Sequence, residues 1–133
     1  MAGDKGKKIE SFEDLEVYKR LVDLHLELHS ISLIFPKFEL YELGSQIRRS
    51  SNSIPANLAE GWNNKHTNIY LEGINRALGE LRETRHHLHI AYRKEYLPKE
   101  GYKDLLTRYE ECSMMLHALR KSLLRWKEVA GGR

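Results

Sequence analysis

The sequence predicts an all-α protein, an antiparallel up-down four-helix bundle, on three observations. Leucine, glutamate, lysine and arginine are abundant, and only three of the 133 residues are prolines, a composition that favours helices. Apolar residues recur at alternating steps of three and four, which places them on one face of a helix. Turn and helix-stop residues separate four such stretches, and short connections of this kind join antiparallel neighbours.

The first helical stretch begins near Ser11 and ends at Phe35–Pro36. Ser11 is a predicted N-cap, with Asp14 three residues later, and a residue before proline avoids the α region. The apolar stripe of this helix is Val17, Leu21, Leu24, Leu28, Ile31 and Phe35. A second apolar set either widens the face toward the core or forms a self-association surface. This set contains Leu15, Tyr18, Val22, Leu26 and Leu33.

The third and fourth stretches repeat the pattern. Gly61 is predicted to end the second helix, and Asn63–Asn64 to form the turn that follows it. Thr67 is predicted to cap the third helix, and Pro98 to end the third helix. The third stripe is Tyr70, Ile74, Ala77, Leu81, Thr84, Leu88 and Ala91. The fourth is Tyr102, Leu105, Tyr109, Cys112, Leu116, Leu119, Leu123 and Trp126. We predict a bundle over residues 11–128, a disordered N-terminal arm at 1–10 and a flexible C-terminal tail at 129–133.

The second stretch is interrupted by serines and a proline. Its apolar residues are Leu40, Leu43, Ile47, Ile54, Leu58 and Trp62. Pro55 lacks an amide hydrogen and its ring clashes with the carbonyl of Ser51, whereas nearby serines can hydrogen-bond backbone carbonyls. We therefore predict one continuous helix kinked at Pro55. The alternative is a true break, with Ser53 or Ile54 capping a new helix.

Polar side chains form a ladder beside this interrupted stripe. The ladder is Gln46, Arg49, Ser53, Asn57 and Glu60, and Glu80 on the third helix is a natural partner for an arginine here. Buried charges persist only when they are paired and hydrogen-bonded. The ladder therefore either fixes the fold or assembly, or contacts a ligand. No histidine or cysteine nucleophile pattern accompanies it, so we expect no catalytic residues and no enzyme activity.

Charge and cysteine usage narrow the class of protein. The net charge of +3 and the pI of about 9.0 permit nucleic-acid binding without demanding it. The single Cys112 excludes an internal disulfide and a cysteine zinc cluster and fits a reducing compartment. No apolar run approaches the ~20 residues of a membrane span, and the N-terminus lacks the apolar segment of a signal peptide. We expect a cytoplasmic protein with no membrane partner.

Basic side chains gather on the third and fourth stretches and are the candidate nucleic-acid-binding residues. The first set is Arg82, Arg85, His86, His89, Arg93 and Lys94. The second set is Arg120, Lys121, Arg125 and Lys127. Such side chains neutralise phosphates and release counterions. The alternative is a pair of solvated helix faces, because the acids Glu83 and Glu95 dilute the first set.

Two other residue groups are candidates for ligand binding. His25 with His29, and His86 with His89, have spacings that place pairs of imidazoles on one helix face. No carboxylate is spaced as in the Glu-x-x-His of di-iron bundles, so we expect no metal and no cofactor. Trp62 and Tyr70 either stack on bases or staple a loop to the core.

The stretch FPKFELYELGSQIRRSSNSIPANLAEG carries a specific motif. Its residues Phe35, Pro36, Glu39, Tyr41, Leu43, Gln46, Ile47, Arg48, Arg49, Ser53, Ile54, Pro55, Asn57, Ala59, Glu60 and Gly61 match the pattern F-P-x-x-E-x-Y-x-L-x-x-Q-I-R-R-(A/S)-x-x-S-I-P-x-N-I-A-E-G. On this motif the chain resembles the four-helix-bundle family of 23S rRNA intervening-sequence proteins. Leu58 replaces the usual isoleucine and Ser50 the usual alanine, and Ala77–Leu81 match the following helix. The resemblance spans about Phe12 to Trp126.

The resemblance implies an up-down bundle that assembles into a homopentameric ring. The family includes accessory variability proteins of diversity-generating retroelements, which bind a reverse transcriptase and nucleic acid and are not enzymes. Other members are encoded inside fragmented rRNA genes and have no settled activity. We therefore expect a non-catalytic, homo-oligomeric protein that binds RNA or DNA, as an accessory factor to a retroelement reverse transcriptase and its template RNA. The alternative is a structural or protein-interaction module without nucleic-acid affinity.

Overall fold

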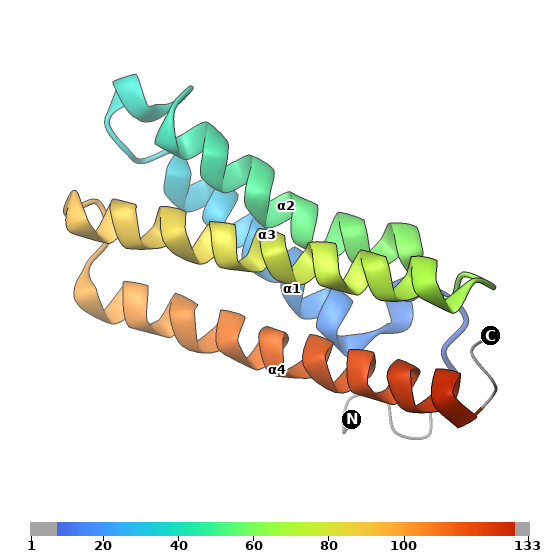
Figure 1. The fold of residues 1–133 in the computed structure, drawn as a ribbon. Coiled ribbons are helices and arrows are strands. Elements are labelled where there is room, and N and C mark those ends of the chain that lie inside the picture. The colour runs from blue at the N-terminus through green and yellow to red at the C-terminus, as the bar shows by residue number, and fades with distance from the viewer. Residues whose placement is uncertain (1–7, 130–133) are drawn as a thin grey trace.

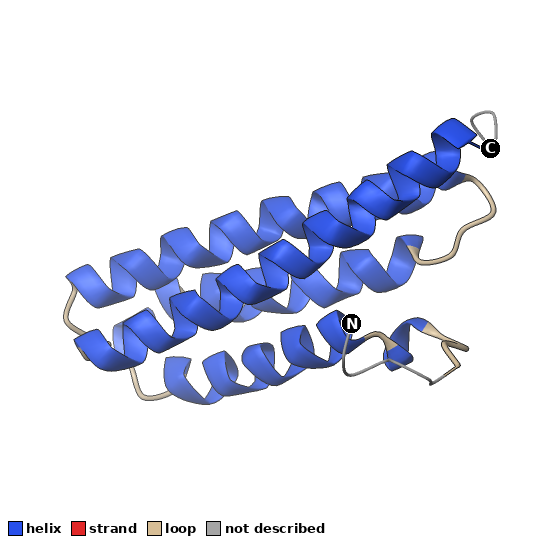
Figure 2. Ribbon diagram, turned by 90° about the horizontal axis from the view of Figure 1, so that it is seen from below, coloured by secondary structure: helices blue, strands red, loops and turns tan. Residues whose placement is uncertain are grey.

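The computed structural model describes residues 8–129, and within that range the chain forms four α-helices and no strand. The elements are η2 (Phe12–Asp14), α1 (Glu16–Ser32), η3 (Lys37–Glu39), α2 (Leu43–Gly61), α3 (Thr67–Arg93) and α4 (Lys99–Val129). The four helices lie side by side and alternate in direction (Figures 1 and 2). This is the predicted four-helix arrangement. Most of the predicted arm (residues 1–7) and of the predicted tail (130–133) lies outside the described residues, and Val129 is the last residue of α4.

The neighbours in the bundle are α1 with α2, α2 with α3, α3 with α4, and α4 with α1. Each helix therefore has two neighbours, and α1 lies diagonally across from α3. The contact between α2 and α3 is the most extensive and that between α1 and α4 the least. No helix within residues 8–129 combines the length and the apolar character needed to cross a bilayer.

The predicted N-cap at Ser11 belongs to η2 and not to α1. The amide of Glu13 donates to Ser11 Oγ at 3.2 Å, and the amide of Ser11 donates to Asp14 Oδ2 at 3.1 Å. Leu15 then adopts an extended backbone, and α1 starts one residue later. At the start of α3, the N-cap position is His66 and Thr67 is already the first helical residue. Ser11 is therefore an N-cap, as predicted, but it caps the short helix η2 instead of α1.

Helix α2 runs without interruption from Leu43 to Gly61 through Pro55, so the predicted alternative of a true break is wrong. A bend of the helix axis at Pro55 stays a prediction. Asn57 Nδ2 donates to the carbonyl of Ser53 at 2.8 Å, and Ser51 Oγ donates to the carbonyl of Arg48 at 3.3 Å. These side-chain bonds to the α2 backbone lie on either side of the proline.

The core is built from the predicted apolar stripes. Its large side chains that are almost fully buried are Leu21, Leu24, Leu28, Ile47, Ile54, Leu58, Ile74, Leu81, Leu88, Leu105, Tyr109 and Leu116. The second apolar set of α1 divides: Leu15 and Tyr18 pack on the core, whereas Leu26 is 57% exposed and Leu33 is 54% exposed. Trp126 was expected in the α4 stripe but is half exposed. The reason is length, because α4 has 31 residues and α1 only 17, so the end of α4 extends past the start of α1.

The buried polar residues of α2 are Ser50 and Ser51, not the predicted ladder. Thr84 Oγ1 donates to Ser50 Oγ at 2.9 Å between α3 and α2, and His25 Nδ1 lies 2.8 Å from Ser51 Oγ between α1 and α2. Burial, aided by the neighbouring His29, lowers the pKa of His25, which favours its neutral form.

The ladder itself follows the outer side of α2. Its residues Gln46, Arg49 and Glu60 are exposed, and Ser53, Asn57 and Glu80 are half-buried. Arg49 Nη1 lies 3.6 Å from Glu80 Oε1 and Arg49 also pairs with Glu83. The ladder therefore contributes a surface link from α2 to α3, and exposed pairs of this kind add little stability.

Two glycines allow α2 and α3 to approach closely. A Cβ added to Gly73 would lie 2.8 Å from the backbone oxygen of Asn57 and 3.2 Å from the Cα of Gly61. The first distance is shorter than real Cβ contacts and the second is tighter than most of them, and the atoms concerned belong to the backbone. The crossing therefore requires the absence of a side chain at Gly73.

We predict that Gly73→Ala lowers the free energy of unfolding by about 1–3 kcal/mol, because the helices must separate. Gly79→Ala is the matched control on the same helix, since its added Cβ would meet only the end of the Arg82 side chain at 3.9 Å. That control is expected to gain roughly 0.5–1 kcal/mol from helix propensity. Urea unfolding followed by circular dichroism measures both. Equal effects of the two substitutions would contradict the close crossing.

Candidate nucleic-acid interface

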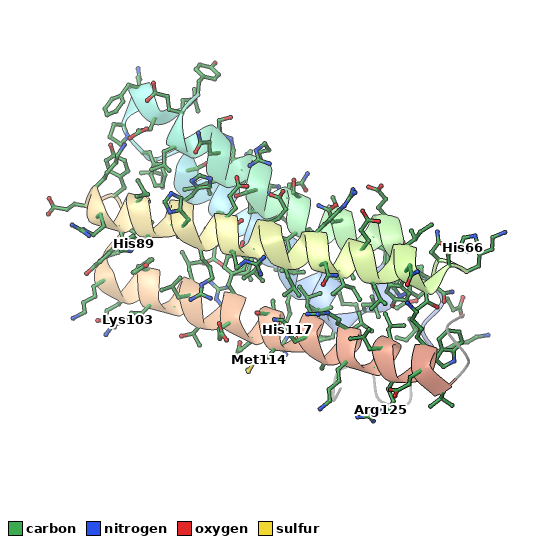
Figure 3. The ribbon with its side chains drawn as sticks, viewed as in Figure 1. His66, His89, Lys103, Met114, His117 and Arg125 are labelled. Carbon is green, nitrogen blue, oxygen red and sulfur yellow. The ribbon has the colours of Figure 1, made fainter. Side chains whose placement is uncertain are left out.

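The antiparallel arrangement places the two predicted basic sets at opposite ends of the α3–α4 pair. Tyr92 of α3 stacks on Tyr102 of α4 at one end, with ring centroids 4.5 Å apart, and Lys127 of α4 hydrogen-bonds Asn68 of α3 at the other. Figure 3 shows His89 and Lys103 at the first end and His66 and Arg125 at the second. From the level of Tyr102 to that of Arg125 the helix rises about 35 Å. The structure therefore contains two basic patches and does not bring the two sets together.

The first patch lies on the outer face of α3. Arg82, His86 and Arg93 are exposed and make no ion pair within residues 8–129. Arg85 is exposed but its Nη1 lies 3.4 Å from Glu110 Oε2, and His89 Nδ1 lies 3.2 Å from the hydroxyl of Tyr102. The patch thus combines three unpaired basic groups with two that already have partners on α4.

Lys99 and Lys103 join this first patch from the start of α4, and sequence reasoning did not select them. Both are exposed. They follow Lys94, the last residue of the first basic set, by five and nine residues and precede Arg120 by 17 or more, so clustering along the sequence missed them. Pairing the end of α3 with the start of α4 would have placed them beside Arg93.

The second patch lies near the end of α4. Lys121 and Arg125 are exposed, whereas Arg120 and Lys127 are half-buried. Lys127 donates a hydrogen bond to Asn68 Oδ1. Trp126 adds an exposed aromatic ring among these basic groups. This patch therefore offers cations and one indole ring at the far end of the same two helices.

Lys94 differs from the other basic residues of its set because its partner is a buried carboxylate. Its ammonium donates to Oε2 of Glu39 at 2.7 Å, and the hydroxyl of Tyr96 donates to the same oxygen at 2.8 Å. Glu39 is 1% exposed, and its Oε1 accepts from the amide of Leu43 at 3.4 Å. The hydrogen bond from Lys94, together with those from Tyr96 and Leu43, holds the pKa of Glu39 below its usual range despite burial.

The charges of the chain are distributed unevenly between the two halves of the bundle. Residues 8–62, which include α1 and α2, contain six lysines and arginines and nine acidic residues. Residues 65–129, which include α3 and α4, contain thirteen lysines and arginines and nine acidic residues. Within residues 8–129 the positive surplus therefore lies on the half that contains α3 and α4, where a polyanion would be attracted.

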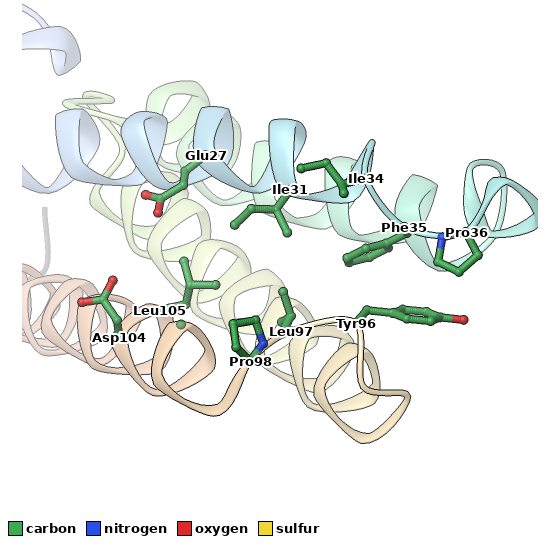
Figure 4. Close-up of a pocket in the computed structure, with 11 residues that line it drawn as sticks. Glu27, Ile31, Ile34, Phe35, Pro36, Tyr96, Leu97, Pro98, Asp104 and Leu105 are labelled. Carbon is green, nitrogen blue, oxygen red and sulfur yellow. The ribbon is translucent and has the colours of Figure 1, made fainter.

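An apolar pocket of about 380 Å³ lies between the α1–α2 loop and the start of α4. Figure 4 shows Ile31, Phe35, Leu97 and Leu105 around it, with two carboxylates at one side. Those carboxylates, Glu27 and Asp104, both pair with Arg108, at 2.7 and 3.0 Å. None of the residues that line this pocket is basic, so it does not form part of a phosphate-binding surface.

The histidine pairs, Trp62 and Tyr70 were the other candidates for ligand binding. Within residues 8–129, no group of three or more histidine, cysteine or acidic residues is arranged to hold a metal ion. Tyr70 is buried, which raises its pKa to about 12, and Trp62 packs against the core. These positions favour the interpretation that Trp62 and Tyr70 hold a loop against the core. Burial also raises the pKa of Cys112, to about 11, which keeps that thiol unreactive.

The fold and the charge distribution define a four-helix bundle with a basic surplus on two adjacent helices. A family model described as 23S rRNA-intervening sequence protein matches residues 13–118, and the chain belongs to this family. The chain is also similar to a solved structure, the crystal structure of a protein with unknown function from the S23 ribosomal protein family of Bacteroides thetaiotaomicron VPI-5482. That similarity has 25% identity and a TM-score of 0.69, and covers 79% of this chain and 98% of the other. A comparison with curated proteins finds no match.

We predict that Glu39→Gln lowers the free energy of unfolding by roughly 2 kcal/mol at pH 7, because a charged acceptor with three donors is lost. The folded-state pKa of Glu39 is below its ordinary value. Its contribution is therefore present above the unfolded-state pKa of about 4.3 and is lost as the pH falls through the folded-state pKa. Urea unfolding at pH 7 and below pH 4 should show the difference between wild type and variant shrinking. The exposed neighbour Glu42, changed to glutamine, is the control and should alter stability little.

Proposed function

We propose that the protein binds nucleic acid, RNA or DNA, through the basic outer surface of α3 and α4 and has no catalytic activity. The observation that carries the proposal is the set of exposed cations without carboxylate partners in the described part of the chain, Arg82, Arg93, Lys121 and Arg125. Such groups bind the phosphate backbone by releasing counterions, without a need for a deep site. The surplus of basic residues on the same two helices supports this choice.

The finer role that we propose is that of a cytoplasmic accessory factor to a retroelement reverse transcriptase. Its support is the resemblance carried by the Phe35–Gly61 motif and the family match over residues 13–118. An accessory factor needs one surface for the nucleic acid and another for the enzyme. The exposed apolar side chains Phe38 and Tyr41, which are 67% and 85% exposed, lie on the α1–α2 connection, at the same end of the bundle as the first basic patch but on a different element. They offer a protein-binding surface and also support the second candidate, a protein-interaction module.

We further propose that the chain self-associates, with five subunits as the number that the resemblance implies. The surface available for it is the outer side of α1 with its following loop, where Leu26, Leu33 and Ile34 are more than half exposed. Isolated apolar side chains at a surface are common, but several close in sequence indicate an interaction site. A ring would repeat each basic patch once per subunit and strengthen the binding of a long polyanion.

The nucleic-acid proposal predicts a linear fall of log affinity with log salt for a structured RNA. The double variant Arg82→Glu/Arg93→Glu should weaken binding at least tenfold and reduce the slope by about two, because each of the two arginines is expected to neutralise one phosphate. Fluorescence anisotropy across a salt series measures both quantities. The control is Lys19→Glu on α1, diagonally across the bundle, which should change binding little.

Each variant is also checked by thermal unfolding. Absence of binding by the wild type at low salt would reject the nucleic-acid proposal. Loss of folding in the double variant would instead show that these arginines are structural.

The self-association proposal predicts a mass near five times 15.6 kDa in sedimentation equilibrium at micromolar concentration. Leu26→Glu with Ile34→Glu should shift the mass to that of a monomer without unfolding the helices, because both side chains are exposed. A wild-type monomer at this concentration contradicts the ring.

A further inference from the structure

An open pocket of about 640 Å³ lies where the end of α3 turns into the start of α4. Unlike the apolar pocket in Figure 4, it is polar and shallow, and its lining includes Tyr92, Arg93, Glu95 and Lys99. Its volume falls within the range of pockets that hold small ligands, roughly 300–1,000 Å³. The pocket adjoins the first basic patch, so it lies at the surface where we propose nucleic-acid binding.

The pocket has an aromatic ring whose plane is fixed. Tyr92 stacks on Tyr102 with ring centroids 4.5 Å apart and planes inclined by 7°. His89 Nδ1 lies 3.2 Å from the Tyr102 hydroxyl and restrains the second ring. A ring held in this way loses little freedom when a flat ligand stacks beside it. Stacking of a nucleobase on an aromatic side chain is the usual way in which proteins bind unpaired nucleotides.

Two cations flank this ring. Arg93 and Lys99 are exposed, and neither makes an ion pair within residues 8–129. Lys99 is the first residue of α4, where the helix dipole is unfavourable to a positive charge and favourable to an anion. A phosphate placed here would be attracted by both side chains and by the start of the helix. Glu100 in the same first turn already complements the helix dipole, so the attraction for a phosphate comes mainly from the Arg93 and Lys99 side chains.

Glu95 occupies a backbone conformation that side chains rarely adopt. Its φ is 66°, and it follows the end of α3, where the amide of Tyr96 donates to the carbonyl of Ala91 at 2.9 Å. Glycine is the usual residue at such a helix end because it has no Cβ. The chain instead has an exposed carboxylate there, in the same pocket as the two cations. Residues that are energetically unfavourable in their local backbone conformation or helix position, when several occur close together, are typical of functional sites.

We propose that this pocket binds one unpaired guanine nucleotide of an RNA strand, an inference that rests on the nucleic-acid-binding function proposed above. Tyr92 stacks on the base, and Arg93 and Lys99 contact the phosphates on either side. The Glu95 carboxylate accepts hydrogen bonds from the N1–H and the exocyclic N2–H of guanine, two adjacent donors that adenine lacks. A paired base inside a duplex hides both of its faces, so the pocket selects single strands and loops.

The test uses anisotropy with the full-length protein and three labelled probes at one salt concentration. They are a 12-nucleotide single-stranded RNA with one central guanine, the same strand with adenine in its place, and the duplex of the first strand. We expect the wild type to bind the guanine strand several-fold more tightly than the adenine strand and about tenfold more tightly than the duplex. Equal affinity for all three overturns this inference and leaves the proposed function intact. Absence of binding to every probe overturns both.

Substitutions at Glu95 separate a role in recognition from a role in folding. Glu95→Gly removes both the carboxylate and the strained side chain, so it should raise the thermal midpoint while abolishing the preference for guanine. Glu95→Gln keeps the strain and should abolish the preference without raising the midpoint. Retention of the preference in either variant contradicts the assignment of Glu95. The control is Lys121→Ala at the far end of α4, which should weaken binding to all three probes to a similar extent.

Discussion

One buried carboxylate holds together the end of the bundle on which the candidate site lies. Glu39 comes from the connection between α1 and α2, yet its donors Lys94 and Tyr96 come from the turn between α3 and α4. A charge this deeply buried is tolerated only because every donor is in place. The Leu43 amide, at the first residue of α2, is one of those donors, so the same contact also fixes where α2 begins. Tyr96 lines both pockets at this end of the molecule, and its position therefore depends on Glu39.

Local periodicity predicted the helices and most of the core, because steps of three and four record which face of a helix is buried. It misplaced the polar centre for a physical reason. The stripe of α2 appeared to pause between Ile47 and Ile54, but Ser50 and Ser51 lie at steps of three and four from those residues and occupy core positions themselves. Small hydroxyl side chains fit there because they bond Thr84 and His25 on the neighbouring helices. A periodicity restricted to apolar residues cannot detect a core position filled by serine.

Other features depended on distances in sequence that no local pattern records. Glu39 was part of a recognised motif, but its burial depends on Lys94, 55 positions later. The basic residues of α3 and α4 were found from composition, whereas their division into two patches follows from the antiparallel arrangement of the helices. The exposure of Trp126 depends on the difference in length between α4 and α1. The sequence thus identified the basic and the apolar residues, whereas the packing of the helices determines which of them lie on the same surface.

Each of the two turns that flank α3 contains one residue with a positive φ, and the two residues differ in type. Asn63, before α3, has a φ of 52°, and Glu95, after it, has a φ of 66°. Asparagine tolerates this conformation because its short side chain hydrogen-bonds locally, whereas for most other residues it costs roughly 1–2 kcal/mol. The turn before α3 therefore needs no functional explanation. The turn after α3 has a glutamate in the strained position and a lysine at the first residue of α4, and both lie beside the stacked tyrosines. The side chains of Lys94 and Tyr96 tie this same turn to Glu39, so the bundle can tolerate there a strained residue that a purely structural turn would not select.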